Sequence, residues 1–246
     1  MNLAQKHGLD FIMPDAPEGT RDRIDQTKAS DFMDPYDKSS ICASDMSFLL
    51  KELYLLGRYS EALGEIPNFC AAVKEHLVGD WQKTLPIEGA VDPEKWHRGI
   101  GWFDDLRDTL MWCSAILDWE SIARILIFID GSVETRKSGE EGRAYYVALR
   151  YHFEGKPAEC EAILKKIISS KNVKYRQLAE CLMAILNEDK PVVSDAWHIV
   201  YERWLKKDAK MDWYLAPEST FLYYLAQSFG CQITLSEEQK DCIVHL

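Results

Sequence analysis

The sequence predicts an all-α fold, a multi-helix bundle of packed helical hairpins with about nine to eleven helices. From about residue 40 onward, apolar residues recur at intervals of three and four positions. Ser, Gly and Pro residues separate these stretches where helices are expected to begin and end. Runs in which β-branched and polar residues alternate are almost absent, and "CQITL" (231–235) is the one short candidate for a strand.

The first third of the chain divides into an arm, two helices and a connection. Residues 1–38 are rich in Asp, Pro and Gly and have weak periodicity, so we expect an extended or irregular N-terminal arm. A helical domain is expected over 39–246, with possible sub-halves 39–80 and 102–246. It begins with the helices "SDMSFLLKELYLLG", which Gly57 would end, and "YSEALGEIPNFCAAVKEHLVG", which Pro67 would kink or split. Residues 79–101 predict a long connection.

The remaining residues predict further helices with recognisable starts. Helices are expected over 102–117 and 119–130, followed by the loop "DGSVETRKSGEEG". Proline suits the first turn of helices that begin at Pro157 and at Pro217. Ser194 is the expected N-cap of another helix, which contains the aromatic stripe of "AWHIVYERW". "SEEQ" at 236–239 has the pattern of a capping box and predicts a terminal helix.

Two segments of the chain are similar to each other, "LYLLGRYSEAL" (53–63) and "RYHFEGKPAECEAIL" (150–164). In each, a helix ends at Gly and a second helix containing Glu-Ala follows, which is how tetratricopeptide-type repeats join their two helices. Gly57 and Gly155 are 98 residues apart, which is not a multiple of the 34-residue repeat, and no third copy is visible. Independent αα-hairpins and a repeat-like array both remain open.

Charge and cysteine content narrow the possible partners and compartment. The formal net charge of −11 argues against nucleic acid and anionic membranes as partners, and it is compatible with a basic protein partner or with solubility alone. The first residues lack the basic and apolar regions of a secretory signal. The seven cysteines include no C-x-x-C pair, so we expect reduced, buried thiols in a cytoplasmic protein.

The sequence contains no recognisable catalytic motif. H-E-x-x-H, the phosphate-binding and dinucleotide-binding glycine patterns and G-x-S-x-G are all absent. None of the six histidines lies four residues from another histidine or from a cysteine, the spacing that would suit a metal site on a helix. We therefore expect no metal site, no cofactor and no enzymatic activity.

One charged cluster lies in "WFDDLRDTLMWCSAILDWE" (102–120). Asp104, Arg107 and Asp108 would share one helix face, either as catalytic carboxylates with an anion clamp, as an internal network, or as a surface that a partner contacts. Residues 101–134 contain seven acidic side chains and two basic ones, and this excess of negative charge supports the interpretation as an acidic surface that a partner contacts. A second charged group near residue 140 fits the first turn of a helix, where acids stabilise the helix dipole. The candidate partner-binding residues are Asp104, Asp105, Arg107, Asp108, Asp130, Glu134, Glu140, Glu141 and Arg143.

Three stretches carry a family resemblance: the pair Arg107–Asp108 followed by "TLMWCSAIL", the hairpin "YYVALRYHFEGKPAECEAIL", and the late helix of "LAPESTFLYYLAQSFGCQITL". With them, residues 81–246 resemble an α-helical family of immunity proteins from bacterial polymorphic toxin systems. The resemblance implies a cytoplasmic, non-enzymatic protein that binds and neutralises a cognate toxin. An acidic face would speed its association with a basic toxin such as a nuclease.

Two other functions remain open on the residues alone. A helical-repeat scaffold would bind a protein partner in a groove, for which Tyr146, Tyr151 and Tyr224 are the candidate lining residues. An enzyme would use a carboxylate site at Asp104 and Asp108, in a deep pocket. The sequence makes no prediction of the oligomeric state.

Overall fold

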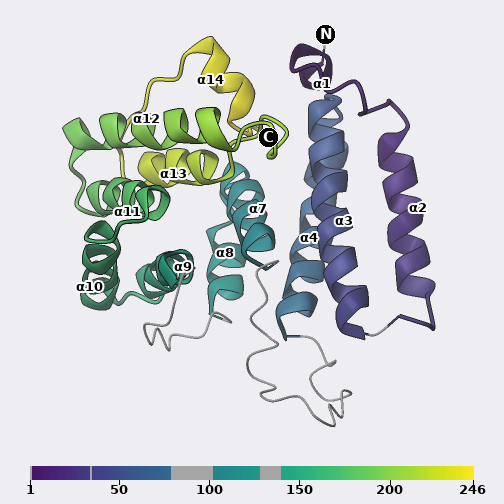
Figure 1. Cartoon of the computed structure of the whole chain (residues 1–246), viewed down its shortest axis with the longest axis horizontal. Coiled ribbons are helices and arrows are strands. Elements are labelled where there is room, and N and C mark those ends of the chain that lie inside the picture. The colour runs from purple at the N-terminus through teal and green to yellow at the C-terminus, as the bar shows by residue number, and fades with distance from the viewer. Residues whose placement is uncertain (1, 34, 79–101, 128–139) are drawn as a thin grey trace. The chain divides into compact units, whose positions relative to one another are not determined.

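A computed structural model describes the backbone of residues 2–33, 35–78, 102–127 and 140–246. It describes their side chains too, except those of residues 35, 36, 78, 102–105 and 140. Across these ranges the chain forms twelve helices and no strand, which confirms the all-α fold (Figure 1). "CQITL" forms neither strand nor helix.

The chain folds as two compact units, residues 1–109 with Leu246 and residues 110–245. The boundary differs from the expected sub-halves, because it falls inside helix α7 (Trp102–Ala115). Unit 1 also contains α1 (Leu3–Lys6), α2 (Ala16–Ala29), α3 (Pro35–Leu55) and α4 (Tyr59–Val78). Helix α3 packs against both α2 and α4, so it forms the centre of this unit.

The prediction of an irregular arm over 1–38 is wrong, because α1, α2 and the start of α3 lie there. The inner face of α2 is made by Pro17, Thr20, Ile24 and Thr27, of which only Ile24 is a large apolar residue. Thr20 can be buried because its hydroxyl donates a hydrogen bond of 2.8 Å to Glu52. Apolar periodicity could not reveal a helix with this inner face, and this helix raises the count above the expected nine to eleven.

Pro67 does not split α4, and it lies on the exposed side of the helix, where water can solvate the carbonyl that loses its hydrogen bond. The inner faces of α3 and α4 form the core of unit 1, and their fully buried side chains include those of Leu49, Leu50, Leu53, Ile66 and Phe69. The helices and core expected over 44–78 are therefore present.

Unit 2 continues with α8 (Trp119–Leu126), α9 (Glu140–Phe153), α10 (Pro157–Ile168) and α11 (Val173–Leu186). It ends with α12 (Lys190–Lys207), α13 (Pro217–Ser228) and α14 (Glu237–Cys242). From α8 to α13 each helix packs against the next one, and α11 also packs against α9 and α13. Alternate helices thus form an inner layer in this unit.

Helix α12 begins earlier than the sequence predicts, and its aromatic side chains are buried. The helix begins at Lys190, with Pro191 in its first turn and Asp189 as its N-cap, so the expectation that Ser194 begins it is wrong. Its aromatic stripe faces the core, and Trp197 is fully buried. The indole N–H of Trp197 donates to the backbone carbonyl of Ser219 at 2.8 Å, which satisfies its one polar group.

Among the described residues, four pairs of neighbouring helices are joined directly by the same type of turn, which also ends α1 at Gly8 and α13 at Gly230. Gly57, Leu117, Gly155 and Glu188 each lie two residues after a helix and have positive φ angles of 79°, 59°, 70° and 53°. The N–H of the next residue in each case donates to the carbonyl five positions earlier, at 2.8 to 3.0 Å. This is the Schellman arrangement, which ends a helix and turns the chain back.

In each of the four helix pairs, the residues at three fixed sequence distances from the turn residue are buried. The positions seven before, five after and nine after the turn residue are all buried. In unit 2 the turn recurs after 38 and 33 residues, at 117, 155 and 188, close to the length of a helix–turn–helix repeat. The twelve residues at these positions are Leu50, Ala62, Ile66, Leu110, Ile122, Leu126, Ala148, Cys160, Leu164, Cys181, Val193 and Trp197.

Candidate functional site

Asp108 is part of an internal polar cluster in unit 1. Its side chain is 8 % exposed, and Lys51 Nζ lies 2.7 Å from its Oδ2. Ser47, one helical turn before Lys51 on α3, donates its hydroxyl hydrogen to the same oxygen. Asp108 is therefore not a surface residue that a partner could contact, and this part of the predicted site is corrected. Sequence reasoning could not find the cluster, because Lys51 is 57 positions away on another helix.

The combination of Ser47, Lys51 and Asp108 resembles a nucleophile with a lysine base. A general base needs a free lone pair, whereas Lys51 is held in an ion pair, and the Ser47 hydroxyl donates to the carboxylate. Ser47 is also 6 % exposed. The arrangement is that of a buried ion pair that fastens α7 to α3.

The other predicted site residues do not gather in one place. Arg107 is half-buried in unit 1, while Glu141 and Arg143 are half-buried at the start of α9 in unit 2. The backbone at 104, 105 and 140 is helical, but the side chains of Asp104, Asp105 and Glu140 lie outside the described residues. Asp130 and Glu134 lie outside the described residues altogether.

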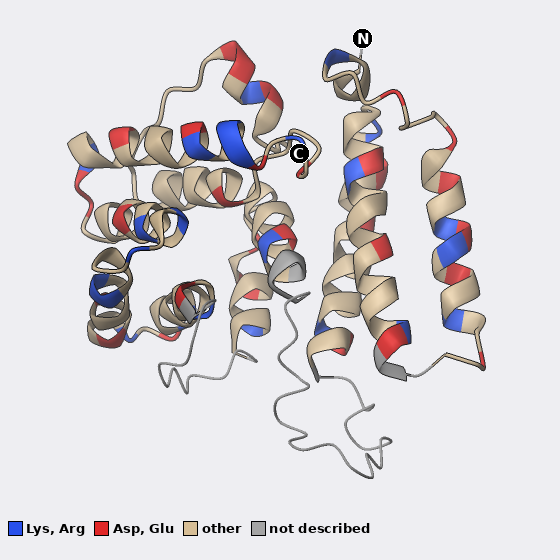
Figure 2. Ribbon diagram, viewed as in Figure 1, with Lys and Arg blue, Asp and Glu red and all other residues tan. Residues whose placement is uncertain are grey.

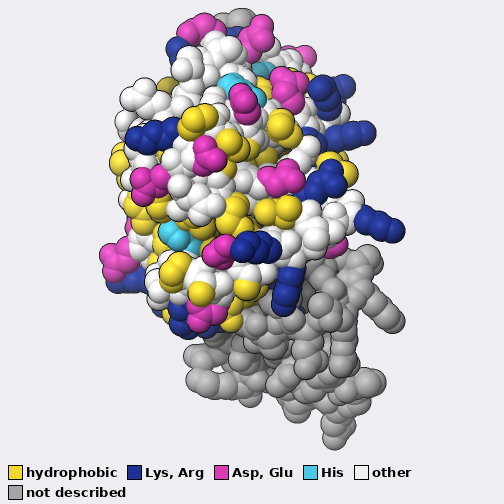
Figure 3. Space-filling view, turned by 90° about the vertical axis from the view of Figure 1, so that its left-hand side faces the viewer, with side chains coloured by type: hydrophobic (Ala, Val, Ile, Leu, Met, Phe, Trp, Pro, Cys, Tyr) yellow, Lys and Arg dark blue, Asp and Glu magenta, His cyan; other side chains and the backbone are white. Residues whose placement is uncertain are grey.

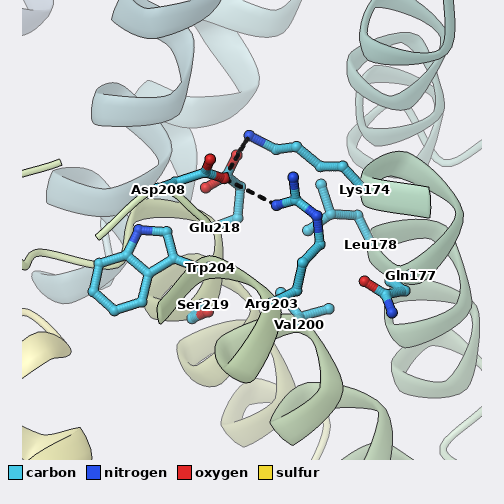
Figure 4. A pocket seen from close by; sticks show the side chains of 9 residues that line it. All are labelled: Lys174, Gln177, Leu178, Val200, Arg203, Trp204, Asp208, Glu218 and Ser219. Atoms are coloured by element: carbon cyan, nitrogen blue, oxygen red, sulfur yellow. Dashed lines mark hydrogen bonds and ion pairs between the residues drawn. The ribbon is translucent and has the colours of Figure 1, made fainter. Parts of the chain in front are cut away.

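A small pocket lies in unit 2 between α11, α12 and the start of α13 (Figure 4). Lys174 Nζ is 2.8 Å from Glu218 Oε1 and 4.0 Å from Asp208 Oδ2, and Arg203 lies 2.9 Å from the same Asp208 oxygen. Two bases and two acids thus link the three helices in a network with no net charge.

Two buried acceptors line the same pocket, Gln177 Oε1 and Ser219 Oγ, and neither has a hydrogen-bond partner among the described residues. The pocket offers about 10 Å³ to the centre of a water molecule, which is roughly the room that one water needs. Pockets that hold organic ligands are usually of about 300 Å³ or more. The arrangement suits hydration of the ion-pair network better than it suits a substrate.

Of the three tyrosines expected to line a groove, Tyr146 is buried, whereas Tyr151 and Tyr224 are half-buried. Tyr146 is 2 % exposed, and the chain segment after α14 covers Tyr224. The Tyr224 hydroxyl donates to the carbonyl of Val244 at 3.1 Å, and burial raises the pKa of this tyrosine to about 12. The N–H of Val244 donates to Thr220 Oγ1, one turn earlier on α13. Tyr146 and Tyr224 therefore hold the fold of unit 2 together and do not line a free groove.

The excess of negative charge belongs mainly to unit 1. Residues 1–109 contain 20 acidic and 12 basic side chains, whereas residues 110–245 contain 20 and 17. In Figure 2, acidic and basic residues are close together on many helices of unit 2. Figure 3 views the molecule from the side on which α10 to α12 lie, and there the two signs are interspersed among hydrophobic side chains.

The described residues contain neither a metal-binding cluster nor a membrane-spanning helix. Among the described residues, no three His, Cys, Asp or Glu side chains form a group that could hold a metal ion. No helix in the described ranges combines the length and the apolar character needed to cross a bilayer.

Comparison with known proteins adds no relative. No protein-family model matches the sequence, and neither the curated proteins nor the solved structures give a match. The class of protein is therefore defined by its own architecture: across the described ranges it is all-helical, and one type of turn directly joins four pairs of neighbouring helices. The resemblance to immunity proteins stays a prediction.

Proposed function

We propose that this protein works by binding another protein, and that the partner is a cognate bacterial toxin that it neutralises in a stoichiometric complex. The observation that carries the binding role is the helix–turn–helix unit that recurs at Gly57, Leu117, Gly155 and Glu188. Arrays of such units present extended surfaces rather than deep pockets, and proteins built from them commonly bind other proteins. The toxin as partner rests on the sequence resemblance.

The charge of the protein supports a basic partner. A net charge of −11 attracts a basic protein and raises the rate at which the two associate, which benefits an inhibitor that must act before its target does damage. A nuclease is a toxin of this kind, since its own surface must attract nucleic acid. In this proposal the protein acts in the cytoplasm, without a cofactor or a catalytic step.

The test is co-expression with the protein encoded by the adjacent reading frame. Expressed alone, that protein should stop growth of a bacterial host, and co-expression should restore growth. In a titration with purified components, neutralisation should be complete at one equivalent of this protein. Complete neutralisation at a small fraction of an equivalent would mean turnover and would contradict a binding mechanism.

A second candidate function is a repeat-like scaffold or adaptor, which the same recurring turn supports. The two differ in the outcome of the same experiment. A complex between the two purified proteins, without toxicity of the neighbour, would favour the scaffold. Toxicity that co-expression leaves unchanged, with no complex formed, would contradict both.

A further inference from the structure

The unpaired acidic residues of unit 1 are concentrated on and around α2. Asp10, Asp15, Asp22, Asp25 and Asp31 are all exposed, and none has a basic partner among the described residues. By contrast, Glu18 in the same segment is bound by Arg58 at 2.7 Å. The segment therefore presents carboxylates that the fold does not use.

The basic residues of α2 do not neutralise these acids, because the fold engages two of the three elsewhere. Arg21 lies 3.2 Å from Glu61 and 3.5 Å from Glu65, both on α4. Arg23 lies 3.3 Å from Asp45 on α3 and donates to Thr20. Only Lys28 remains to offset the exposed aspartates. Figure 2 shows these charges along α2.

Large apolar side chains are exposed at both ends of the same helix. Met13, two residues before the N-cap of α2, is 56 % exposed. After its last turn, Phe32 is 102 % exposed and Met33 is 40 % exposed. Phe32 and Met33 are neighbours, and adjacent exposed apolar side chains of this size are typical of interaction surfaces. Phenylalanine and methionine are also enriched at protein–protein interfaces.

We infer that the outer face of α2 with its two ends, comprising Met13, Asp15, Asp22, Asp25, Phe32 and Met33, is the surface that binds a basic protein partner. Charge complementarity selects this occupant, since nucleic acid and anionic membranes would be repelled. A bound cation does not explain the acids, because Asp15, Asp22 and Asp25 extend over ten positions of chain, about 15 Å of helix. The inference rests on the proposed function, and it moves the contact surface from residues 101–134 to α2.

The probe for this surface is a synthetic helical peptide with lysine on one face and leucine on the other. Its binding to the isotopically labelled protein is followed by NMR, and its affinity is measured by fluorescence anisotropy. We expect the peptide to shift the resonances of residues 10–33 most strongly. A peptide in which glutamate replaces every lysine should not bind.

A pair of variants with equal change of net charge separates local from global electrostatics. D22K/D25K reverses two exposed aspartates on α2, and E159K/D195K reverses two exposed acids on α10 and α12. We expect the α2 variant to lower peptide affinity at least tenfold and the control to lower it less than threefold. A third variant, M13S/F32S, should also weaken binding, while circular dichroism shows that all variants remain folded.

Equal loss of affinity in the two charge variants, absence of binding, or shifts centred outside residues 10–33 would each overturn the inference. Growth rescue distinguishes its failure from failure of the proposed function. If wild type and D22K/D25K neutralise the toxin equally well, the toxin-binding role is supported and the assignment of the contact surface to α2 is contradicted. If no toxin is neutralised but the peptide binds α2 as expected, the binding surface on α2 is supported and the proposal of a toxin as partner is contradicted.

Discussion

Asp108 and Lys51 form an ion pair whose side chains are 8 % and 14 % exposed. Removing both ions from water is costly, and their attraction together with the hydrogen bond from Ser47 offsets that cost. The pair is consequently sensitive to loss of one member, because a charge would then remain buried without compensation.

Replacing Asp108 with Ala should lower the free energy of unfolding by about 3 kcal/mol, because Lys51 loses its counter-charge. Chemical denaturation monitored by circular dichroism measures this change. The double variant K51M/D108L, in which neither charge remains, should be markedly more stable than D108A. If D108A were as stable as the wild type, the ion pair would not contribute to the fold.

Glu52 is a second buried acid, in which the cost of removing a charge from water competes with a favourable hydrogen bond. Burial raises its pKa, and the hydrogen bond from Thr20 acts in the opposite direction with a smaller effect. A carboxyl whose pKa is raised by folding favours the folded state below its ordinary range near 4.5 and opposes it as the pH rises above the folded value. The ionised Glu52 therefore lowers the stability of the fold at neutral pH. Its hydrogen bond with Thr20 connects α3 to α2.

At the scale of elements, the recurring turn is defined by backbone conformation and not by residue type. Gly57 and Gly155 adopt the left-handed conformation without steric cost, whereas Leu117 and Glu188 adopt it with a side chain present. The sequence therefore revealed only the two copies with glycine. The other two became recognisable from their φ angles and from the hydrogen bonds that close the turn.

Opposite substitutions at two copies of the turn should have opposite effects. Glu188→Gly should raise the free energy of unfolding by about 1 kcal/mol, because glycine removes the strain of a side chain at a φ of 53°. Gly155→Ala should lower it by a similar amount, since it introduces that strain at a φ of 70°.

Thermal and urea unfolding of both variants provide the measurement for these turns. A Cβ at Gly155 would meet no atom within 4 Å, so a loss of stability there reports backbone strain and not a clash. Destabilisation by Glu188→Gly would mean that the glutamate side chain stabilises the turn by more than its conformation costs.

At the scale of the whole molecule, the seven cysteines are reduced, and six of them are buried. The exception is Cys70 on α4, which is half-buried. Burial raises the pKa of Cys160 to about 11 and that of Cys42 and Cys181 above the ordinary value of a thiol. These three thiols are thus both shielded and protonated at neutral pH.

Folded protein should react quickly with an aromatic disulfide reagent at one thiol, that of Cys70, and at all seven only after unfolding. The absorbance of the released thiolate counts the reactive groups. In C70S the fast phase should disappear, with the total in denaturant reduced by one. Two or more fast thiols in the wild type would show that the buried cysteines become exposed in the native state.

The sequence by itself determined the all-α class, the helices over 44–78, the aromatic stripe of α12 and two copies of the turn. These features follow from local signals, namely apolar spacing, proline in first turns and glycine at helix ends. It also suggested that Asp108 has a structural partner as one of three interpretations, without identifying Lys51.

Only the tertiary structure decided the rest. Helix α2 is recognisable once Thr20 meets Glu52, and Asp108 becomes an internal residue once α7 lies beside Lys51. Tyr224 is covered because Val244 returns to α13. Each of these depends on a polar group meeting a partner from a distant part of the chain, and the burial of a polar residue is decided by such a partner rather than by its own neighbours in sequence.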